Sequence, residues 1–378
     1  MVGRSLVPVA LAVAVALVAT LAAPVAPVAG EPRLGDESVQ VGRCAAQAGD
    51  ALATAGGSRA GYVSCGPRPH ADIRFLAAAP GGDARPSEPT WMAGDVLGMA
   101  SDATGTYVLY ATSVDIRVGK RTTTGALSFR VVDGWRGRRP EGDIVARDGR
   151  WFAVWSKQTG PGGRLAQTEL FSAGSIVPVR QVTDTPADVA DAQPSLVYSG
   201  ATPVLVWSRT YRAWRPGPSD LMVSKYLGGS WQATRVFTAV GDHNTAPDVL
   251  VARDRTFVTW VRDGFVMVAS DATGVFVSHR FDTRGDRPRV AASTTSGGAI
   301  GRVVVAWTTT GAPGDRRAYA AVSASAGGAV DGAWEGAVVS APDSTLVGVA
   351  PAARGVDDVG AGTVVVAGPE RVVSRTVG

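Results

Sequence analysis

The residues most suited to ligand chemistry lie in one long polar segment, SRTYRAWRPGPSD, between two apolar runs. An aromatic ring flanked by arginines can stack on a sugar ring or bind an anionic group. The sequence therefore predicts ligand contacts by Tyr211, Arg212, Trp214 and Arg215. The alternative is that Trp214 simply packs inside a long loop.

Polar residues also gather in three shorter segments, TDTPADVADAQP, VGDHNTAPD and DTRGDRP. We expect them to share a face with the Trp214 segment and to add ligand contacts. Their candidate residues are Asp191, Asp242, His243, Asn244 and Asp286. The alternative is ordinary turn capping, because Asp and Asn are favoured in turns by local hydrogen bonding.

Signatures of metal and cofactor chemistry are missing from the sequence. There is no Asp-x-Asp-x-Asp run, Gly-x-Ser-x-Gly elbow, His-Glu-x-x-His site or phosphate-binding loop. We expect no metal and no cofactor, and the catalytic residues stay unknown. Because a glycosidase needs only two suitably spaced carboxylates, a glycoside hydrolase remains an open alternative.

The elements that would position these residues form a repeat. Apolar β-rich runs recur with an aromatic marker at Tyr110, Trp155, Trp207, Trp260 and Trp307, at spacings of 45, 52, 53 and 47 residues. Val, Thr, Trp and Phe in short runs broken by Gly, Pro and Asp exclude a helical repeat. The sequence predicts an all-β protein, a β-propeller of four-stranded blades. The markers are expected to pack between blades as core.

The number of blades depends on the two ends of the repeat. Five complete blades can be cut from residues 91–340, and residues 345–378 supply only three strands. A strand at 71–80 could complete that last blade, and closure would remove two exposed sheet edges. We expect six blades closed by this N-terminal strand, with five or seven blades as the alternative.

One hairpin resembles a known family. SKYLGGSW (224–231) has the spacing of the Asp box of sialidase-like propellers, with Tyr226 where that motif has Asp. The resemblance covers 71–378 at the level of fold and implies a six-bladed propeller. In that family three arginines bind a carboxylate, an Asp is the acid/base and a Tyr activated by a Glu is the nucleophile. Here the family's Arg-Ile-Pro motif is absent, and no Tyr–Glu pair can be placed.

The N-terminus indicates an exported protein. Residues 1–30 combine one arginine, a long apolar run and a proline-rich small-residue end, as in a signal peptide; an uncleaved membrane anchor is the alternative. Residues 31–70 form a separate segment in which Cys44 and Cys65 are expected to form a disulfide. A metal site is the less favoured alternative there.

Composition limits the partners. The 378 residues are 45% hydrophobic and 19% charged with a net charge of +4, and the basic residues are scattered, which argues against nucleic acid. We expect a secreted or envelope-associated monomer, without a membrane span after signal removal, that binds an extracellular glycan or protein through its loop face. The alternatives are a divergent sialidase-like glycoside hydrolase and a structural module of the envelope.

Overall fold

The structure is a computed structural model. It describes residues 38–42, 46–47, 53–55, 58–65, 72–78, 84–160, 167–211, 217–232, 234–238, 241–253, 255–271, 276–295, 299–312, 315–324, 327–340, 345–351, 362–367 and 371–377. Every regular element in these ranges is a β-strand, as the sequence predicts. The signal peptide expected at 1–30 and Cys44 lie outside the described residues, and so does the side chain of Cys65, so the disulfide stays a prediction.

The first sheets in chain order consist of antiparallel neighbours joined by short turns. The strands before residue 100 that form one sheet are β2 (Ala46–Gln47), β3 (Ala53–Ala55), β4 (Ser58–Cys65), β5 (Asp72–Ala78) and β6 (Ala84–Ala93). The next blade contains β7 (Asp95–Asp102), β8 (Gly105–Ala111), β9 (Asp115–Thr122) and β10 (Leu127–Gly134). It is followed by β11 (Gly142–Arg147), β12 (Arg150–Gln158), β13 (Thr168–Gly174) and β14 (Arg180–Gln181).

The remaining strands complete the set. One blade contains β15 (Val189–Ser199), β16 (Thr202–Tyr211), β17 (Ser219–Leu227), β18 (Ser230–Trp231) and β19 (Arg235–Val236). A seven-stranded sheet follows: β20 (Asn244–Ala252), β21 (Arg255–Arg262), β22 (Phe265–Asp271), β23 (Phe276–Thr294), β24 (Ile300–Thr309), β25 (Ala318–Ser323) and β26 (Trp334–Val338). The last sheet contains β27 (Thr345–Pro351), β28 (Gly362–Ala367), β29 (Arg371–Val377) and β1 (Ser38–Gly42).

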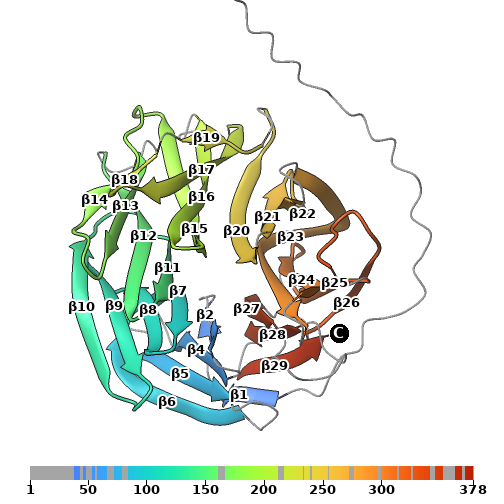
Figure 1. The fold of residues 1–378 in the computed structure, drawn as a ribbon, viewed down its shortest axis with the longest axis horizontal. Coiled ribbons are helices and arrows are strands. Elements are labelled where there is room, and N and C mark those ends of the chain that lie inside the picture. The colour runs from blue at the N-terminus through green and yellow to red at the C-terminus, as the bar shows by residue number, and fades with distance from the viewer. Residues whose placement is uncertain are drawn as a thin grey trace, which may run out of the picture.

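The sheets are arranged in a ring, with the first strand of each blade near its centre (Figure 1). The fold is a β-propeller, as the sequence predicts. The seven-stranded sheet is two blades joined by the long strand β23, whose first half pairs with β22 and whose second half pairs with β24. Strand pairing among the described residues therefore gives seven units of four or more strands, and the expected count of six is not confirmed.

The strand that closes the ring is not the one the sequence suggested. The stretch expected at 71–80 is β5, which pairs with β4 on one side and β6 on the other, so it has no free edge for the last blade. Strand β1 pairs with β29 instead. Closure by an N-terminal strand is thus correct in kind and wrong in residue range. The same sheet contains β4, which precedes residue 71, the expected start of the propeller.

The repeated aromatic residues form the core between blades, as expected. The indole side chains of Trp155, Trp207 and Trp307 are completely buried, and Trp260 is nearly so. Each packs with apolar residues of its own and a neighbouring blade; Trp155, for example, shares a cluster with Leu109 and Ile144. Each blade therefore buries its faces against its neighbours, which is why the marker recurs at one strand position.

The Asp-box-like hairpin plays a structural role here. Its two glycines, Gly228 and Gly229, have φ angles of 60° and 83°, as a tight two-residue turn between β17 and β18 requires. The turn brings Tyr226 and Trp231 together, with ring centroids 5.4 Å apart, and both rings pack on Phe152 of the preceding blade. The hairpin thus fastens one blade to the next.

The innermost strands of three blades share an unusual irregularity. β15, β20 and β23 each shift register at a β-bulge that contains a left-handed residue followed by proline. The left-handed residues are Gln193, Ala246 and Arg287, with φ angles of 54°, 50° and 49°. Proline suits a bulge because it has no N–H to give to the strand ladder. A bulge leaves neighbouring backbone groups unpaired within the sheet.

Side chains of the preceding blade satisfy these backbone groups. The carboxylate of Glu141 accepts a hydrogen bond from the backbone N–H of Gln193 (3.1 Å), and the side chain of Gln193 accepts one from Ala246 (2.8 Å). We call this set of bonds the inter-blade belt.

A second level of the belt lies two residues further along each strand. Asp143 accepts from the backbone N–H of Leu196 (2.7 Å), Ser195 from Val249 (3.0 Å) and Asp248 from Val290 (2.8 Å). The blades must approach closely for these bonds to form. At Gly98, a Cβ would lie only 2.8 Å from the Cα of Asp143, so this position requires glycine.

Replacing one belt acceptor tests its contribution. In Asp248→Ala, the backbone N–H of Val290 loses its acceptor and Arg289 loses a carboxylate 3.2 Å away. The free energy of unfolding should fall by about 1–3 kcal/mol, because a buried donor is left unsatisfied. Urea denaturation measures this. In the matched control Asp282→Ala, the lost side chain is 96% exposed, so the change should stay within about 0.5 kcal/mol; equal losses in both variants would contradict the role of the belt.

Candidate functional site

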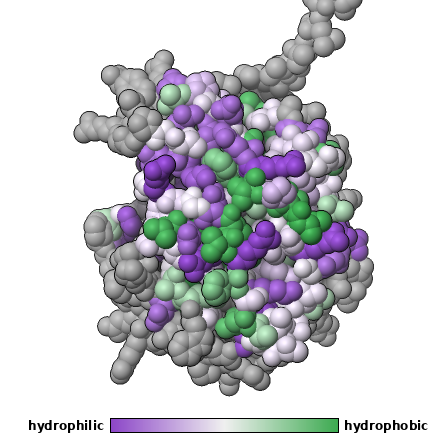
Figure 2. Space-filling model, turned by 90° about the vertical axis from the view of Figure 1, so that its left-hand side faces the viewer, coloured by the Kyte–Doolittle hydropathy of each residue, from purple (hydrophilic) through white to green (hydrophobic). Residues whose placement is uncertain are grey.

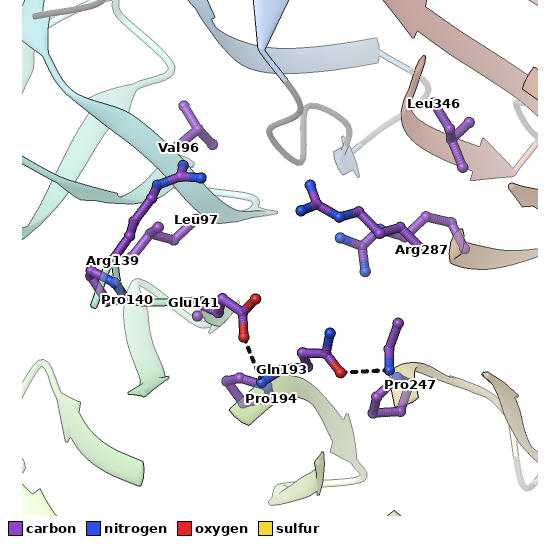
Figure 3. Close-up of a pocket in the computed structure, with 13 residues that line it drawn as sticks. Val96, Leu97, Arg139, Pro140, Glu141, Gln193, Pro194, Pro247, Arg287 and Leu346 are labelled. Atoms are coloured by element: carbon purple, nitrogen blue, oxygen red, sulfur yellow. Dashed lines mark hydrogen bonds between the residues drawn. The ribbon is translucent and has the colours of Figure 1, made fainter. Parts of the chain in front are cut away.

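A cavity of about 130 Å³ lies at the centre of the ring. The innermost strands β7, β11, β15, β20, β23 and β27, with the connection that precedes β11, supply its lining: Val96, Leu97, Arg139, Pro140, Glu141, Gly142, Gln193, Pro194, Ala246, Pro247, Arg287, Arg289 and Leu346. Figure 3 shows these residues converging from different sides of the channel. The bulges of β15, β20 and β23 all reach this cavity, so the irregularity of the strands shapes its wall.

Three arginines line the cavity, and two of them are ion-paired. Arg139 forms an ion pair with Asp95 (2.9 Å), and Arg289 forms one with Asp248 (3.2 Å). These carboxylates lie behind the wall and hold the two guanidinium groups in place. Arg287 is freer: its side chain is 53% exposed, and its ion pair with Asp286 is long at 3.9 Å.

The arginines come from opposite walls. Arg139 precedes β11, whereas Arg287 belongs to the bulge of β23, and Figure 3 shows the two on opposite sides of the cavity with their side chains directed into it. A guanidinium group presents a planar fork of donors that matches a carboxylate. A carboxylate placed between these walls would meet donors from both sides.

Glu141 is the single acidic side chain among the thirteen lining residues. One of its carboxylate oxygens, Oε2, accepts the belt hydrogen bond from Gln193. Its other oxygen can accept a hydroxyl hydrogen from a ligand. The lining thus combines donors for an anion with an acceptor for a hydroxyl group. A sugar acid carries both of the groups that these would bind, a carboxylate and hydroxyls.

Two residues expected in the site are buried and internally bonded. Asp191 is fully buried and accepts two hydrogen bonds from Arg209, at 2.8 and 2.7 Å, which raise the pKa of that guanidinium. Asn244 is also fully buried: its side chain donates to the backbone oxygen of Ser219 and accepts from the indole of Trp260. Both connect strands, and neither lines the cavity.

The other expected residues are nearer the surface. Asp242 forms an ion pair with Arg262. His243 is exposed, and its backbone N–H donates to Asp263 (3.2 Å). Asp286 is exposed next to Arg287. Arg212, Trp214 and Arg215 lie outside the described residues, so their expected ligand contacts stay a prediction, as do those of Tyr211.

Tyr211 belongs to a row of polar residues beside the cavity residues rather than among them. Asp191, Arg209 and Asp220 are direct neighbours across β15, β16 and β17. Burial and the nearby charge of Asp242 raise the pKa of Asp220, against a hydrogen bond from Tyr211 that lowers it. Burial, and then the charge of Asp220, raise the pKa of Tyr211, so its hydroxyl keeps its proton and donates to Asp220.

The three polar segments of the sequence contain the three bulges and include Arg287, but the other residues of the cavity were not singled out, although a signal for them exists. Pro194, Pro247 and Pro288 each stand near the start of a blade's first strand, in the runs AQPSL, TAPDV and DRPRV. A proline repeated at that position indicates a bulge on the innermost strand. The residue before it is then the one to examine, and in β23 that residue is Arg287.

Comparisons with known proteins give likenesses of fold. No protein-family model and no curated protein matches the chain. Among solved structures, it is similar to a triple arginine-to-alanine mutant of AofleA from Arthrobotrys oligospora (TM-score 0.49, 11% identity, 82% of this chain and 90% of that one). It is also similar to Trypanosoma rangeli sialidase in complex with sialic acid (0.44, 10%, 91% and 54%) and to an alpha-L-arabinofuranosidase from Lactobacillus brevis (0.37, 10%, 55% and 80%). At these identities and TM-scores, the likenesses say nothing of what this chain binds.

The described residues contain no cluster of three or more His, Cys, Asp or Glu side chains arranged to hold a metal ion. They also contain no helix long and apolar enough to cross a membrane.

The raised pKa of Asp220 predicts a pH-dependent stability. Because the folded state holds this proton more tightly than the unfolded chain does, the stabilisation is complete below the unfolded pKa of about 3.9 and is lost as pH rises through the folded value. Asp220→Asn should therefore be more stable than the parent protein at pH 7, and the difference should vanish toward about pH 4. Thermal melts across this range measure it, with Asp282→Asn as the exposed control. An Asn variant less stable at pH 7 would refute the assignment.

Proposed function

We propose that the protein is an exported β-propeller that binds an extracellular glycan bearing a carboxylate, with the carboxylate in the central cavity. The observation that supports this most is the placement of Arg139, Arg287 and Arg289 around one small cavity with a single acidic lining residue, Glu141. Guanidinium groups held in position before binding lose little conformational freedom when an anion arrives, which favours affinity.

The size of the cavity limits what it can hold. About 130 Å³ is well below the 300–1,000 Å³ typical of sites for drug-sized ligands. It has room for the carboxylate and part of one sugar ring, and Glu141 is placed to accept a hydroxyl group of that ring. The rest of a glycan would lie outside the cavity, over the face of the ring that bears its loops.

The lining of the cavity supports binding better than it supports hydrolysis. A glycosidase of the common type uses two carboxyl groups about 5–10 Å apart, and the lining residues supply one, Glu141. The proposal that the protein is exported rests on the sequence of residues 1–30, which lie outside the described part of the chain. N-terminal sequencing of the mature protein would locate the cleavage site.

The binding test compares a sugar acid with its neutral parent. We expect galacturonic acid to bind the mature protein and galactose to bind at least tenfold more weakly by isothermal titration calorimetry, because galactose lacks the charge that the arginines recognise. Arg287→Ala should weaken galacturonate binding about tenfold, as expected for the loss of one charge-assisted contact of 1.5 kcal/mol or more. Arg287 is half exposed, so the variant should fold normally.

The control is Arg147→Ala. Arg147 is 48% exposed, pairs with Asp148 and is not part of the cavity, so its loss should leave binding unchanged. Equal binding of galacturonic acid and galactose, or equal effects of both arginine variants, would overturn the proposal. Release of a reducing sugar from a polyuronide, lost in Glu141→Gln, would establish the hydrolase in its place.

A further inference from the structure

A second and larger cavity, of about 950 Å³, lies between the β7–β10 and β11–β14 blades. Its lining residues are Val114, Gly134, Trp135, Arg136, Gly137, Lys157, Gln158, Thr159, Gly160 and Phe171. They come from the β8–β9 turn, the connection after β10, the end of β12 and the middle of β13. We call this cavity the side groove.

The side groove and the central cavity share one segment of chain. In the connection between β10 and β11, residues 135–137 line the side groove, and residues 139–141 line the central cavity. The ends of β12 and β11 that border the two cavities are also paired, with Gly142 opposite Trp155. The two cavities therefore lie next to each other at the same end of the blades.

Trp135 is fixed in the wall of the side groove. Its backbone N–H donates to the oxygen of Val114 (2.9 Å), and its indole Nε1 donates to the oxygen of Thr112 (3.0 Å). The indole is half-buried, with its polar atom already used, so the part that lines the groove is the apolar ring. An aromatic ring held in one position offers a stacking surface at low entropic cost.

Polar groups stand beside this ring in fixed positions. Lys157 donates to Asp133 (2.7 Å) and lies 4.1 Å from the centre of the Phe171 ring, while its ammonium group keeps two further hydrogens. Gln158 accepts a hydrogen bond from the backbone of Arg138 (2.8 Å). Arg136 is exposed. Among the described residues that line the groove, two are cationic and none is acidic.

The face outside the groove differs in character. Exposed apolar side chains gather on β10 and the β13–β14 connection, namely Leu127, Phe129, Val131, Ile176 and Val179. Figure 2, which looks at this side of the ring, shows a hydrophobic band with hydrophilic residues along it. Nothing in the structure shows what covers this band, whereas the groove combines a ring, cations and a position next to the central cavity.

We propose that the side groove binds the sugars that follow the one in the central cavity, so that the ligand is an acidic oligosaccharide with carboxylates on consecutive sugars. Trp135 stacks on a sugar ring, and Lys157 and Arg136 face the next carboxylate. This inference rests on the proposed function, because the groove would bind an oligosaccharide whose first sugar occupies the central cavity.

The experiment compares galacturonic acid with its linear trimer by calorimetry on the mature protein. The trimer should bind at least about tenfold more tightly than the monomer, the size of effect expected for one stacked aromatic contact and one charged contact. Trp135→Ala should remove this gain and leave monomer binding unchanged. Arg287→Ala, in contrast, should weaken both ligands.

Two further variants keep the result decisive. Thr159→Trp adds bulk to the groove at an exposed position and removes nothing from the core, so it should abolish the gain even if Trp135→Ala folds poorly. Trp151→Ala is the matched control, because Trp151 is half-buried against the same apolar cluster as Trp135 and lies outside both cavities; it should keep the gain.

The possible failures are distinguishable. Monomer binding that depends on Arg287, with a trimer no tighter than the monomer, would overturn the side groove and leave the proposed function standing. A trimer gain that survives both Trp135→Ala and Thr159→Trp would also overturn the groove. If neither ligand binds, the proposed function fails and the groove proposal fails with it.

Discussion

Backbone N–H groups at the centre of the ring need acceptors, and most features of this protein depend on how they find them. A bulge removes a residue from the ladder of its own sheet, and a buried N–H without an acceptor costs free energy. Here the acceptor comes from the preceding blade: Glu141 serves Gln193, and Gln193 serves Ala246. The blades that begin with β15 and β20 are thereby each placed against the preceding blade by a specific hydrogen bond as well as by apolar packing. The apolar clusters around the buried tryptophans supply non-directional packing, and the hydrogen bonds add a directional contact between specific residues.

The same arrangement forms the wall of the central cavity. A bulged residue is released from the alternation of the strand, so its side chain can turn toward the channel. At Gln193 the released side chain is used for the belt, at Ala246 there is none to use, and at Arg287 it extends into the cavity. Asp248 joins the two roles, because it accepts from the backbone of Val290 and also holds Arg289. The position of Arg289 in the cavity wall is therefore maintained by a residue that the fold already needs.

The sequence predicted the features that repeat from blade to blade, but it did not predict the closing strand or the site. The spacing of Trp155, Trp207, Trp260 and Trp307 gave the propeller and its core, because each indole occupies the same strand position in its own blade. The closing strand was placed wrongly because the sequence of β4, rich in small residues, carries little alternation, yet β4 pairs with one edge of β5 while β6 pairs with the other. For the site, residue type was a poor guide. Asp191 and Asn244 lie in polar segments of the kind that bind ligands, and both are buried in internal bonds, whereas Arg287 acquires its position only from a backbone angle.

Closure by β1 and β29 has a consequence for the order of events during folding. Ser38 pairs with Ser374, so the first described strand finds its partner only in the last one. During synthesis from the N-terminus, nearly all the blades have been made before this pairing is possible. Contacts between residues so distant in sequence are slow to form. Until then both strands keep open edges of the kind that recruit other chains. A chain that ends before β29 therefore cannot close the ring, because β1 then has no strand to pair with.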